Sequence, residues 1–236
     1  MKLIIQIPCL NERDHLEETI AALPRRIEGI DAIEVLVVDD GSTDGTSEKA
    51  AQLGVHHIVR FPTNRGLSAA FMAGLEASLR LGADIIVNTD ADNQYPGGDI
   101  PRLVTPILRG DADIVIGDRQ TDRIGHFSWL KRTMQRWGSR AVRAVSGTRV
   151  VDATSGFRAI RRSAACRMFV HNRFSYTLET IIQGGHLGFG FANVPIVTNP
   201  KRRASRLFRS VPQYLRRNGP VILRAYAMVR PAQTFL

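Results

Sequence analysis

Cysteine and long apolar runs are scarce in this sequence, and acidic residues almost vanish from its second half. The two cysteines, Cys9 and Cys166, lie far apart, so we expect no disulfide framework and a reducing compartment. No apolar run reaches the roughly 20 residues that a membrane-spanning helix needs. The N-terminal residues lead directly into a strand-like L-I-I-Q-I and lack the length and charge of a secretion signal. These absences favour a cytoplasmic protein.

Charge is divided unequally along the chain. Residues 1–122 hold 11 lysines and arginines against 20 acidic residues, whereas residues 123–236 hold 21 against 2, which are Asp152 and Glu179. The net charge of +10 therefore combines an acidic half suited to a metal ion with a basic half suited to phosphates or anionic lipid. A nucleic-acid-binding protein would also be basic, but these basic residues lack interleaved aromatics and no recognised nucleic-acid module is present. We therefore expect no nucleic acid among the partners.

Short runs rich in β-branched residues alternate with helical patterns through the first half. A chain of 236 residues with 44% hydrophobic content suits one large α/β domain. Strand–helix alternation predicts βαβ units, right-handed crossovers and a mostly parallel sheet. The expected strands are 2–7, 33–38, 55–60, 85–88 and 113–116, and the expected helices are 12–23, 44–53, 67–81 and 100–108.

The second half is less regular. We expect helices at about 129–145, 163–169 and 176–185, a loop at 152–158 and a strand at 191–197. The final stretch is amphipathic, because Leu207, Val211 and Leu215 share a helical face with arginines mostly opposite. The apolar segment 221–229 is too short to cross a bilayer but suits its interface. An ordinary helix packed on the domain, with arginines extending to solvent, is the alternative.

Two carboxylates follow the expected strand 85–88. Asp90 and Asp92 flank a single residue, Ala91. Ligands of open α/β sheets lie beyond the carboxyl ends of the strands, and two carboxylates there can converge on Mg²⁺ or Mn²⁺. Isolated D-x-D pairs are common in loops. This pair follows an expected strand and precedes a Pro-Gly turn, which makes the pattern more specific.

The strand 33–38 ends in a second acidic pair, Asp39 and Asp40. Adjacent like charges cost free energy unless water, backbone amides or a ligand offset them, and a carboxylate here can bind a nucleobase or ribose. Asn11, after the first strand, could be a helix N-cap or part of the same site. Together, these strand-end residues predict a nucleotide site.

Four segments in order resemble family-2 GT-A glycosyltransferases: P-C-L-N-E at 8–12, V-V-D-D-G-S-T-D-G-T at 37–46, N-R-G at 64–66 and T-D-A-D-N-Q-Y-P at 89–96. Three later segments resemble dolichyl-phosphate mannose synthases and bacterial polyprenyl-phosphate glycosyltransferases: I-G-D-R at 116–119, D-A-T-S-G-F-R at 152–158, and V-P-I at 194–196 before a basic run. The resemblance covers about residues 3–210. It implies an α/β, Rossmann-like GT-A fold with a mostly parallel sheet and C-terminal amphipathic helices. It also implies a catalytic domain at 1–204, with a donor and metal half at 1–122 and an acceptor half at 123–204, and a basic membrane-interface segment at 205–236.

The resemblance also assigns site residues by position. It implies that Asp90, Asp92 and Gln94 hold the metal and the diphosphate. Arg119 and the loop Ser155–Arg158 would face the donor sugar or the acceptor phosphate. Catalytic roles are expected for Asp92, Arg119 and Arg158. The residues expected to bind the nucleotide sugar are Pro8, Leu10, Glu12, Val38, Asp40, Asp90, Ala91, Arg119, Ser155 and Arg206.

The basic run departs from the family pattern. Members usually carry a G-x-S-K element after V-P-I that grips the diphosphate. Here Arg203 stands in place of the glycine and Arg206 in place of the lysine. The phosphate contact of this chain is therefore expected at Arg206, and the donor need not be that of the family.

The activity that the resemblance implies is inverting transfer of a sugar from GDP-mannose or a UDP-hexose to a polyprenyl phosphate. A phosphate monoester has a second pKa of about 6, so it is mostly dianionic near neutral pH and needs cations to hold it rather than a strong base. The metal would stabilise the departing nucleoside diphosphate. The alternative is a family-2 transferase with a soluble or saccharide acceptor, in which Asp152 or Glu179 could be the base. Either acid could instead only neutralise neighbouring arginines.

The expected partners are the nucleotide-sugar donor, the polyprenyl phosphate and an anionic membrane surface, and a homo-oligomer stays open. Related bacterial enzymes often continue from a Y-x-M-x-R-P-like segment, here 226–231, into transmembrane helices, whereas this sequence ends at Leu236. We therefore expect either peripheral docking at the inner face of the membrane or a chain trimmed before such helices.

Overall fold

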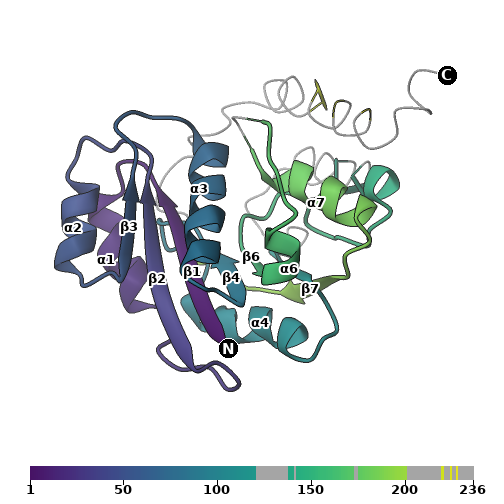
Figure 1. The fold of residues 1–236 in the computed structure, drawn as a ribbon, viewed down its shortest axis with the longest axis horizontal. Coiled ribbons are helices and arrows are strands. Elements are labelled where there is room, and N and C mark those ends of the chain that lie inside the picture. The colour runs from purple at the N-terminus through teal and green to yellow at the C-terminus, as the bar shows by residue number, and fades with distance from the viewer. Residues whose placement is uncertain are drawn as a thin grey trace.

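A seven-stranded sheet forms the centre of the molecule (Figure 1). The computed structural model describes residues 1–120, 138–140, 142–172, 175–200 and positions 219, 220, 224 and 227. The strand order is β3-β2-β1-β4-β6-β5-β7, and every pairing is parallel except those that β6 makes with β4 and β5. The strands are β1 (Lys2–Cys9), β2 (Ala32–Asp39), β3 (His57–Arg60), β4 (Ile85–Asn88), β5 (Ile114–Asp118), β6 (Arg158–Arg161) and β7 (Phe191–Pro195).

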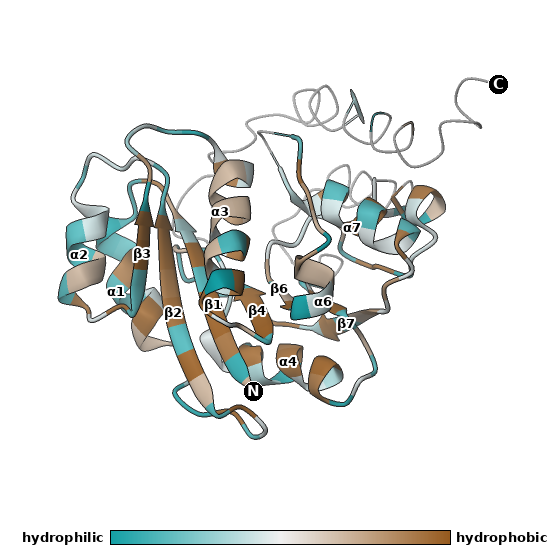
Figure 2. Cartoon of the chain, viewed as in Figure 1, coloured by the Kyte–Doolittle hydropathy of each residue, from teal (hydrophilic) through white to brown (hydrophobic). Residues whose placement is uncertain are grey.

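Helices cover both faces of this sheet. One core is formed with α1 (Arg13–Ala21), α2 (Thr46–Gln52) and α4 (Ile100–Leu108), which the short η1 (Gly97–Asp99) precedes. The other is formed with α3 (Leu67–Arg80), α6 (Arg162–Ala165) and α7 (Thr177–His186). Strand β1 serves both, because Ile5 and Ile7 enter the first core and Ile4 enters the second. Burial on two faces explains why the central strands are apolar along most of their length (Figure 2).

The sequence-based prediction of a mostly parallel α/β fold is confirmed. The bounds of β4 and α4 are as predicted, and the ends of the other predicted elements of the first half lie within two residues of those expected. The second half also has the predicted α7 and β7, each within two residues. Of the helix expected at 129–145, residues 138–140 and 142–145 are helical and the others lie outside the described residues.

Two elements of the second half differ from the prediction. Strand β6 was not predicted, since only its first residue, Arg158, was placed, at the end of the loop 152–158. The strand forms because Ala159 and Ile160 pair with β4 on one side and with β5 on the other. Helix α6 ends at Ala165, four residues earlier than expected. The chain after it is held on α7 instead, since Phe169 N–H donates to Gln183 Oε1 and Gln183 Nε2 donates to Phe169 O.

The C-terminal segment is described only in part. Gly219, Pro220, Arg224 and Ala227 are helical, while the boundary after 204 and the remaining residues of 205–236, Arg206 among them, lie outside the described residues. The division of the chain at 122 and 204 therefore stays a prediction. Among the described helices, none combines the length and apolar character required to cross a membrane. Both cysteines are free, with Cys9 buried and Cys166 exposed.

Candidate active site

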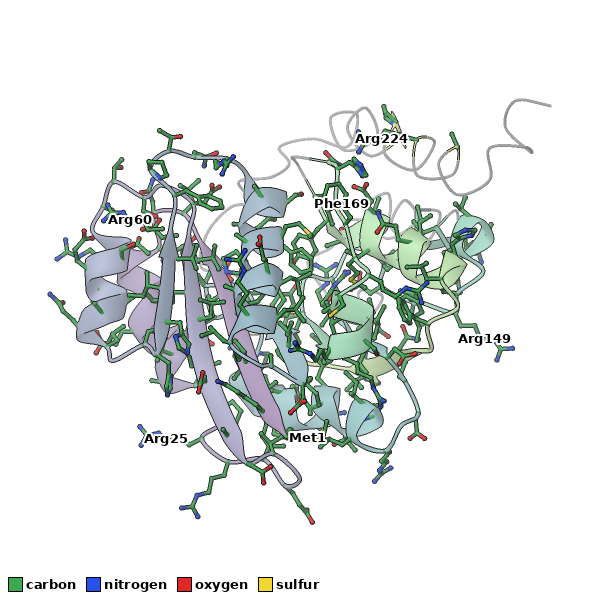
Figure 3. All side chains as sticks on the ribbon, viewed as in Figure 1. Met1, Arg25, Arg60, Arg149, Phe169 and Arg224 are labelled. Carbon is green, nitrogen blue, oxygen red and sulfur yellow. The ribbon has the colours of Figure 1, made fainter. Side chains whose placement is uncertain are left out.

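The candidate site lies at the carboxyl edge of the parallel strands. Strand β1 pairs with β2 on one side and β4 on the other, so the strand order reverses between β1 and β4, which is where open α/β sheets bind ligands. Because β6 is antiparallel to β4, the loop before it, residues 152–157, enters the strand at this same edge. In Figure 3, Arg60, the last residue of β3, lies at the opposite end of the molecule from Met1.

The loops after β1 and β2 are joined to each other. Asn11 adopts a left-handed backbone conformation with φ of 53°. Its N–H donates to Ser42 Oγ at 2.9 Å and its Oδ1 accepts from Thr43 N–H at 2.9 Å. The N-cap residue of α1 is Glu12, so Asn11 acts as a link between the two loops rather than as a helix cap.

The acidic pair after β2 is offset by the protein's own donors. Asp39 is fully buried, and its carboxylate accepts from Ser42 N–H at 2.8 Å and from the Ser47 hydroxyl. The Asp40 carboxylate accepts from the backbone N–H groups of Arg65 at 2.7 Å and Gly66 at 2.9 Å. Backbone amides, one of the offsets expected from the sequence, therefore contribute at both carboxylates. Asp40 thereby holds the N-R-G segment at the start of α3.

Four other residues expected to bind the nucleotide sugar lie at or near this edge. Pro8 and Leu10 are half-buried, and Glu12 is 5% exposed. Val38 is fully buried in the second core. Their roles, and that of Asp40, stay predictions.

The loop after β4, residues 89–95, is termed the metal loop here. Asp90, Asp92 and Gln94 are all half-exposed in it. Asp92 Oδ1 accepts from Gln94 N–H at 3.2 Å, which forms a tight turn. Ala91 is nearly buried, and its carbonyl oxygen accepts from Thr19 Oγ1 on α1 at 2.8 Å. The loop is therefore fastened to the domain between its two aspartates.

The donor set of the metal loop fits a hard divalent cation. Within the described ranges, no three His, Cys, Asp or Glu side chains gather closely enough to hold a metal by themselves. Two carboxylates and the amide oxygen of Gln94 leave coordination positions for a diphosphate and water, which is how proteins commonly hold Mg²⁺.

Gly156 connects the metal loop to the 152–157 loop. Its N–H donates to Tyr95 Oη at 3.3 Å, and its carbonyl oxygen accepts from Asn88 Nδ2 at 2.9 Å. A β-carbon at this position would lie 2.9 Å from Tyr176 Oη and 3.3 Å from Asp90 Oδ1. Only glycine therefore allows the backbone to approach the Asp90 carboxylate this closely. Burial raises the pKa of Tyr95 to about 12, so its hydroxyl stays neutral near pH 7.

Beneath Gly156 lies a chain of buried hydrogen bonds. Gln6 Nε2 on β1 donates to Asn88 Oδ1 at 2.9 Å, and Asn88 Nδ2 also donates to Tyr176 Oη at 2.8 Å. The Tyr176 ring stacks on Phe71 of α3, with ring centroids 3.8 Å apart. Burial raises the pKa of Tyr176 as well. This network links β1, β4, α3 and the start of α7 under the site.

Arg119 and Asp152 form a buried ion pair with two hydrogen bonds. Arg119 Nε donates to Asp152 Oδ2 at 2.6 Å and Nη2 donates to Asp152 Oδ1 at 2.8 Å. Nη2 also donates to Thr154 Oγ1 at 2.6 Å. Burial alone would raise the pKa of Asp152, but the Arg119 guanidinium outweighs it and holds that pKa below its usual range. Asp152 therefore stays ionised and fixes the plane of the Arg119 guanidinium.

Arg158 is fully buried beneath the 152–157 loop. Its guanidinium donates to Thr180 Oγ1 at 2.7 Å and to the carbonyl oxygens of Ser155 and Thr177. It also lies over the Tyr176 ring, 5.3 Å from the centroid. Burial lowers the pKa of this guanidinium. These contacts hold the loop against α7. Direct contacts of Arg158 or of the buried Ser155 with a substrate stay predictions.

Glu179 fastens a different part of the second half. Its carboxylate accepts from the backbone N–H groups of His171 and Asn172, each at 3.1 Å. Arg224 Nη2 lies 3.7 Å from Glu179 Oε1, which brings one residue of the C-terminal segment to α7. In Figure 3, Arg224 and Phe169 lie toward the same end of the molecule as Arg60.

Several residues that shape the site have no individual role in the sequence-based prediction. Asn88 had a signal, because it is a polar residue at the end of an apolar strand. Tyr95 lies inside the motif 89–96, in which the metal was assigned to Asp90, Asp92 and Gln94. Gly156 lies in the loop Ser155–Arg158, which was expected to face a substrate, but its contact with Tyr95 was not predicted. Asn199 had no signal in the sequence, because its contacts with Asn93 and Gln94 of the metal loop span about a hundred residues.

Comparisons with known proteins agree on one family. The sequence profile of Glycosyl transferase family 2 matches residues 4–169. Undecaprenyl-phosphate mannosyltransferase of Micrococcus luteus is 31% identical over 206 residues, which are 83% of this chain and 83% of the relative. Polyprenol monophosphomannose synthase of Mycolicibacterium smegmatis is 27% identical over 204 residues, which are 82% of this chain and 76% of the relative.

Solved structures show the same fold. Glucosyl-3-phosphoglycerate synthase of Mycobacterium tuberculosis, in complex with UDP, matches with a TM-score of 0.72 at 23% identity. The match covers 97% of this chain and 79% of the chain of that enzyme. The complex of the same enzyme with Mn²⁺, UDP and glucosyl-3-phosphoglycerate has a TM-score of 0.69 at 20% identity, with the same coverage. The predicted GT-A fold is thus confirmed, and the match of its profile to most of the sequence shows that this chain belongs to glycosyl transferase family 2.

Proposed function

We propose that this chain transfers a hexosyl group from GDP-mannose or a UDP-hexose to a polyprenyl phosphate at the cytoplasmic face of a membrane. The observation that carries the proposal is the meeting of the metal loop with the 152–157 loop, through Gly156, where the strand order reverses. The names of two relatives, which act on undecaprenyl phosphate and polyprenol, support the acceptor.

The metal loop forms the donor side of the proposed site. Asp90, Asp92 and Gln94 would hold Mg²⁺ or Mn²⁺, which supplies positive charge to the nucleoside diphosphate as it departs. The turn between Asp92 and Gln94 and the contact of Ala91 with Thr19 hold these side chains in place before the donor arrives. Complexes of the Mycobacterium tuberculosis enzyme with Mn²⁺ and UDP support a metal-dependent donor.

Arg119 supports the acceptor side. Its hydrogen bonds to Asp152 and Thr154 use Nε and Nη2. Among the described residues, nothing accepts from Nη1, whose two N–H groups suit a phosphate oxygen. A guanidinium with a fixed plane can hold an acceptor phosphate beside the sugar, and this dianion needs no strong base to act as the nucleophile. Attack by the phosphate on the anomeric carbon would invert its configuration.

The two acids that follow residue 122 argue against a hydroxyl acceptor that needs a base. Asp152 gives both carboxylate oxygens to Arg119, and its pKa is held low. Glu179 accepts from two backbone N–H groups. A general base must be free to take a proton, whereas Asp152 is bound to Arg119 through both oxygens and Glu179 binds two backbone N–H groups.

The proposal is tested by following a radiolabelled sugar. The protein is incubated with Mn²⁺ and either labelled GDP-mannose or labelled UDP-glucose, together with polyprenyl phosphate in detergent or with 3-phosphoglycerate. Metal-dependent label that partitions into the organic phase with polyprenyl phosphate supports the proposal. Label only in a water-soluble product made from 3-phosphoglycerate would show a soluble acceptor and overturn it.

A further inference from the structure

The segment after β7 crosses the edge of the sheet to reach the metal loop. Two strands, β5 and β6, separate β7 from β4. The chain after β7 first follows β5, because Ile196 N–H donates to Asp118 O at 2.9 Å. Three residues later, Asn199 N–H donates to Gln94 O at 2.9 Å and Asn199 Nδ2 donates to Asn93 O at 2.8 Å. One asparagine thus binds two successive carbonyl groups of the metal loop.

These two carbonyl groups belong to the turn that positions Asp92. Asn93 has a left-handed backbone conformation with φ of 53°, which asparagine adopts more readily than most residues. The next N–H, that of Gln94, closes the turn by donating to Asp92 Oδ1. Because Asn199 binds the carbonyl oxygens of the two peptide groups that flank the α-carbon of Gln94, it restrains the orientation of this turn.

We propose that Asn199 is a positioning residue of the metal loop, which acts through Asn93 and Gln94 to hold Asp92 and Gln94 in the arrangement that receives a metal-bound nucleoside diphosphate. The inference rests on the proposed function, because it assigns the donor to this loop. It adds that the arrangement of the metal loop depends on the segment that follows β7. Asn199 lies at the end of a segment that starts beside Asp118, the residue before Arg119, so the same segment connects the donor and acceptor sides.

Strand β7 supplies a matched control. The side chain of Asn193 also binds two backbone groups, since its Oδ1 accepts from Val151 N–H at 2.9 Å and its Nδ2 donates to Arg149 O at 3.1 Å. Asn193→Ala removes both of these bonds, whereas Asn199→Ala removes only the bond from Nδ2 to Asn93. A purely structural effect should therefore be at least as large in the Asn193 variant.

The first readout needs no ligand. Hydrogen exchange is measured on the ligand-free protein, in peptides that cover residues 89–96. Asn199→Ala should speed exchange in these peptides, while Asn193→Ala should leave them as in the wild type. Unchanged exchange in the Asn199 variant would overturn the inference, because the side chain would then not restrain the loop.

The second readout is the affinity for nucleotide. GDP and UDP are titrated with Mn²⁺ into each protein by calorimetry, and the donor KM and kcat are measured for the nucleotide that binds. Loss of one hydrogen bond should weaken metal-dependent binding in Asn199→Ala by roughly 2- to 10-fold. The donor KM should rise more than kcat falls, and Asn193→Ala should match the wild type.

The outcomes separate the two proposals. Equal loss of affinity in both asparagine variants would overturn the positioning role, because it would reflect general destabilisation. A wild-type protein that binds neither nucleotide with Mn²⁺ would overturn the proposed donor site and the role of Asn199 in it. The exchange experiment would still decide whether Asn199 restrains the loop.

Discussion

Replacement of Asp152 by asparagine should lower the free energy of unfolding and slow sugar transfer. Asparagine keeps the shape of the side chain but leaves the Arg119 guanidinium, which is 15% exposed, without its counter-charge. Arginine does not lose its proton in proteins, so the buried positive charge persists. Removing one member of a buried ion pair costs roughly 3–5 kcal/mol, and the partial exposure of Arg119 favours the lower end of this range.

The size of this effect suits a thermal or urea unfolding experiment. A loss of about 3 kcal/mol should lower Tm by roughly 6–12 °C in a chain of this length. The matched control is Asp99→Asn, because Asp99 pairs with Arg102 at 2.8 Å but that arginine is 56% exposed. Exposed pairs of this kind contribute roughly 0–1 kcal/mol, so the control should unfold almost as the wild type does.

The pH dependence gives a second check on the same pair. The pKa of Asp152 is lower in the folded protein than its usual value of about 3.9 in the unfolded chain. The stabilisation is therefore complete above the unfolded pKa and is lost as pH falls through the folded pKa. The difference in unfolding free energy between wild type and Asp152→Asn should stay constant from about pH 8 to pH 5 and shrink below about pH 4. A difference below about 1 kcal/mol at pH 7, equal to that of an exposed pair, would refute the reasoning.

Two further substitutions test the neighbouring contacts. Gly156→Ala should weaken metal-dependent nucleotide binding and cost roughly 1–3 kcal/mol of stability, since its β-carbon would crowd Tyr176 and Asp90. Gly98→Ala, in open space, is the control, and equal calorimetric titrations of the two variants would contradict the crowding. Glu179→Gln should lower the free energy of unfolding in urea by roughly 1–3 kcal/mol, because the two backbone N–H groups bind different carboxylate oxygens and the NH2 group that replaces one oxygen cannot accept. An unchanged unfolding midpoint would show that these hydrogen bonds contribute little.

The parallel half of the sheet could be predicted because its signals are local. Each strand from β1 to β5 is a short β-branched run, and the acidic residues stand at the ends of these runs. Placing Asp90 and Asp92 at the carboxyl edge required only the general rule for ligand sites in open sheets. Strand β6 gave no such signal. Its four residues begin and end in arginine, and their extended conformation depends on pairing with two strands distant in sequence.

The contacts within the site depended on tertiary structure in the same way. Asp152 was recognised as one of two acids in a basic half, but its pairing with Arg119 joins positions 33 residues apart. Asn199 and Asn93 are 106 residues apart. Arg158 was expected to face a substrate because of its motif, and this role stays a prediction. Its burial beneath the loop was not predicted, because it follows from the packing of α7, which a single sequence does not display.

The most direct test of the metal-dependent donor site is calorimetric titration of the protein with GDP and with UDP, each with and without Mn²⁺. The wild type should bind one of the two nucleotides tightly only when Mn²⁺ is present. Asp92→Asn should lose this binding, with a fall in transfer rate of roughly 10²–10³ if the lost contact resembles other preorganised electrostatic groups. Equal binding by wild type and Asp92→Asn, or binding that does not depend on Mn²⁺, would contradict a metal-dependent donor site at the end of β4.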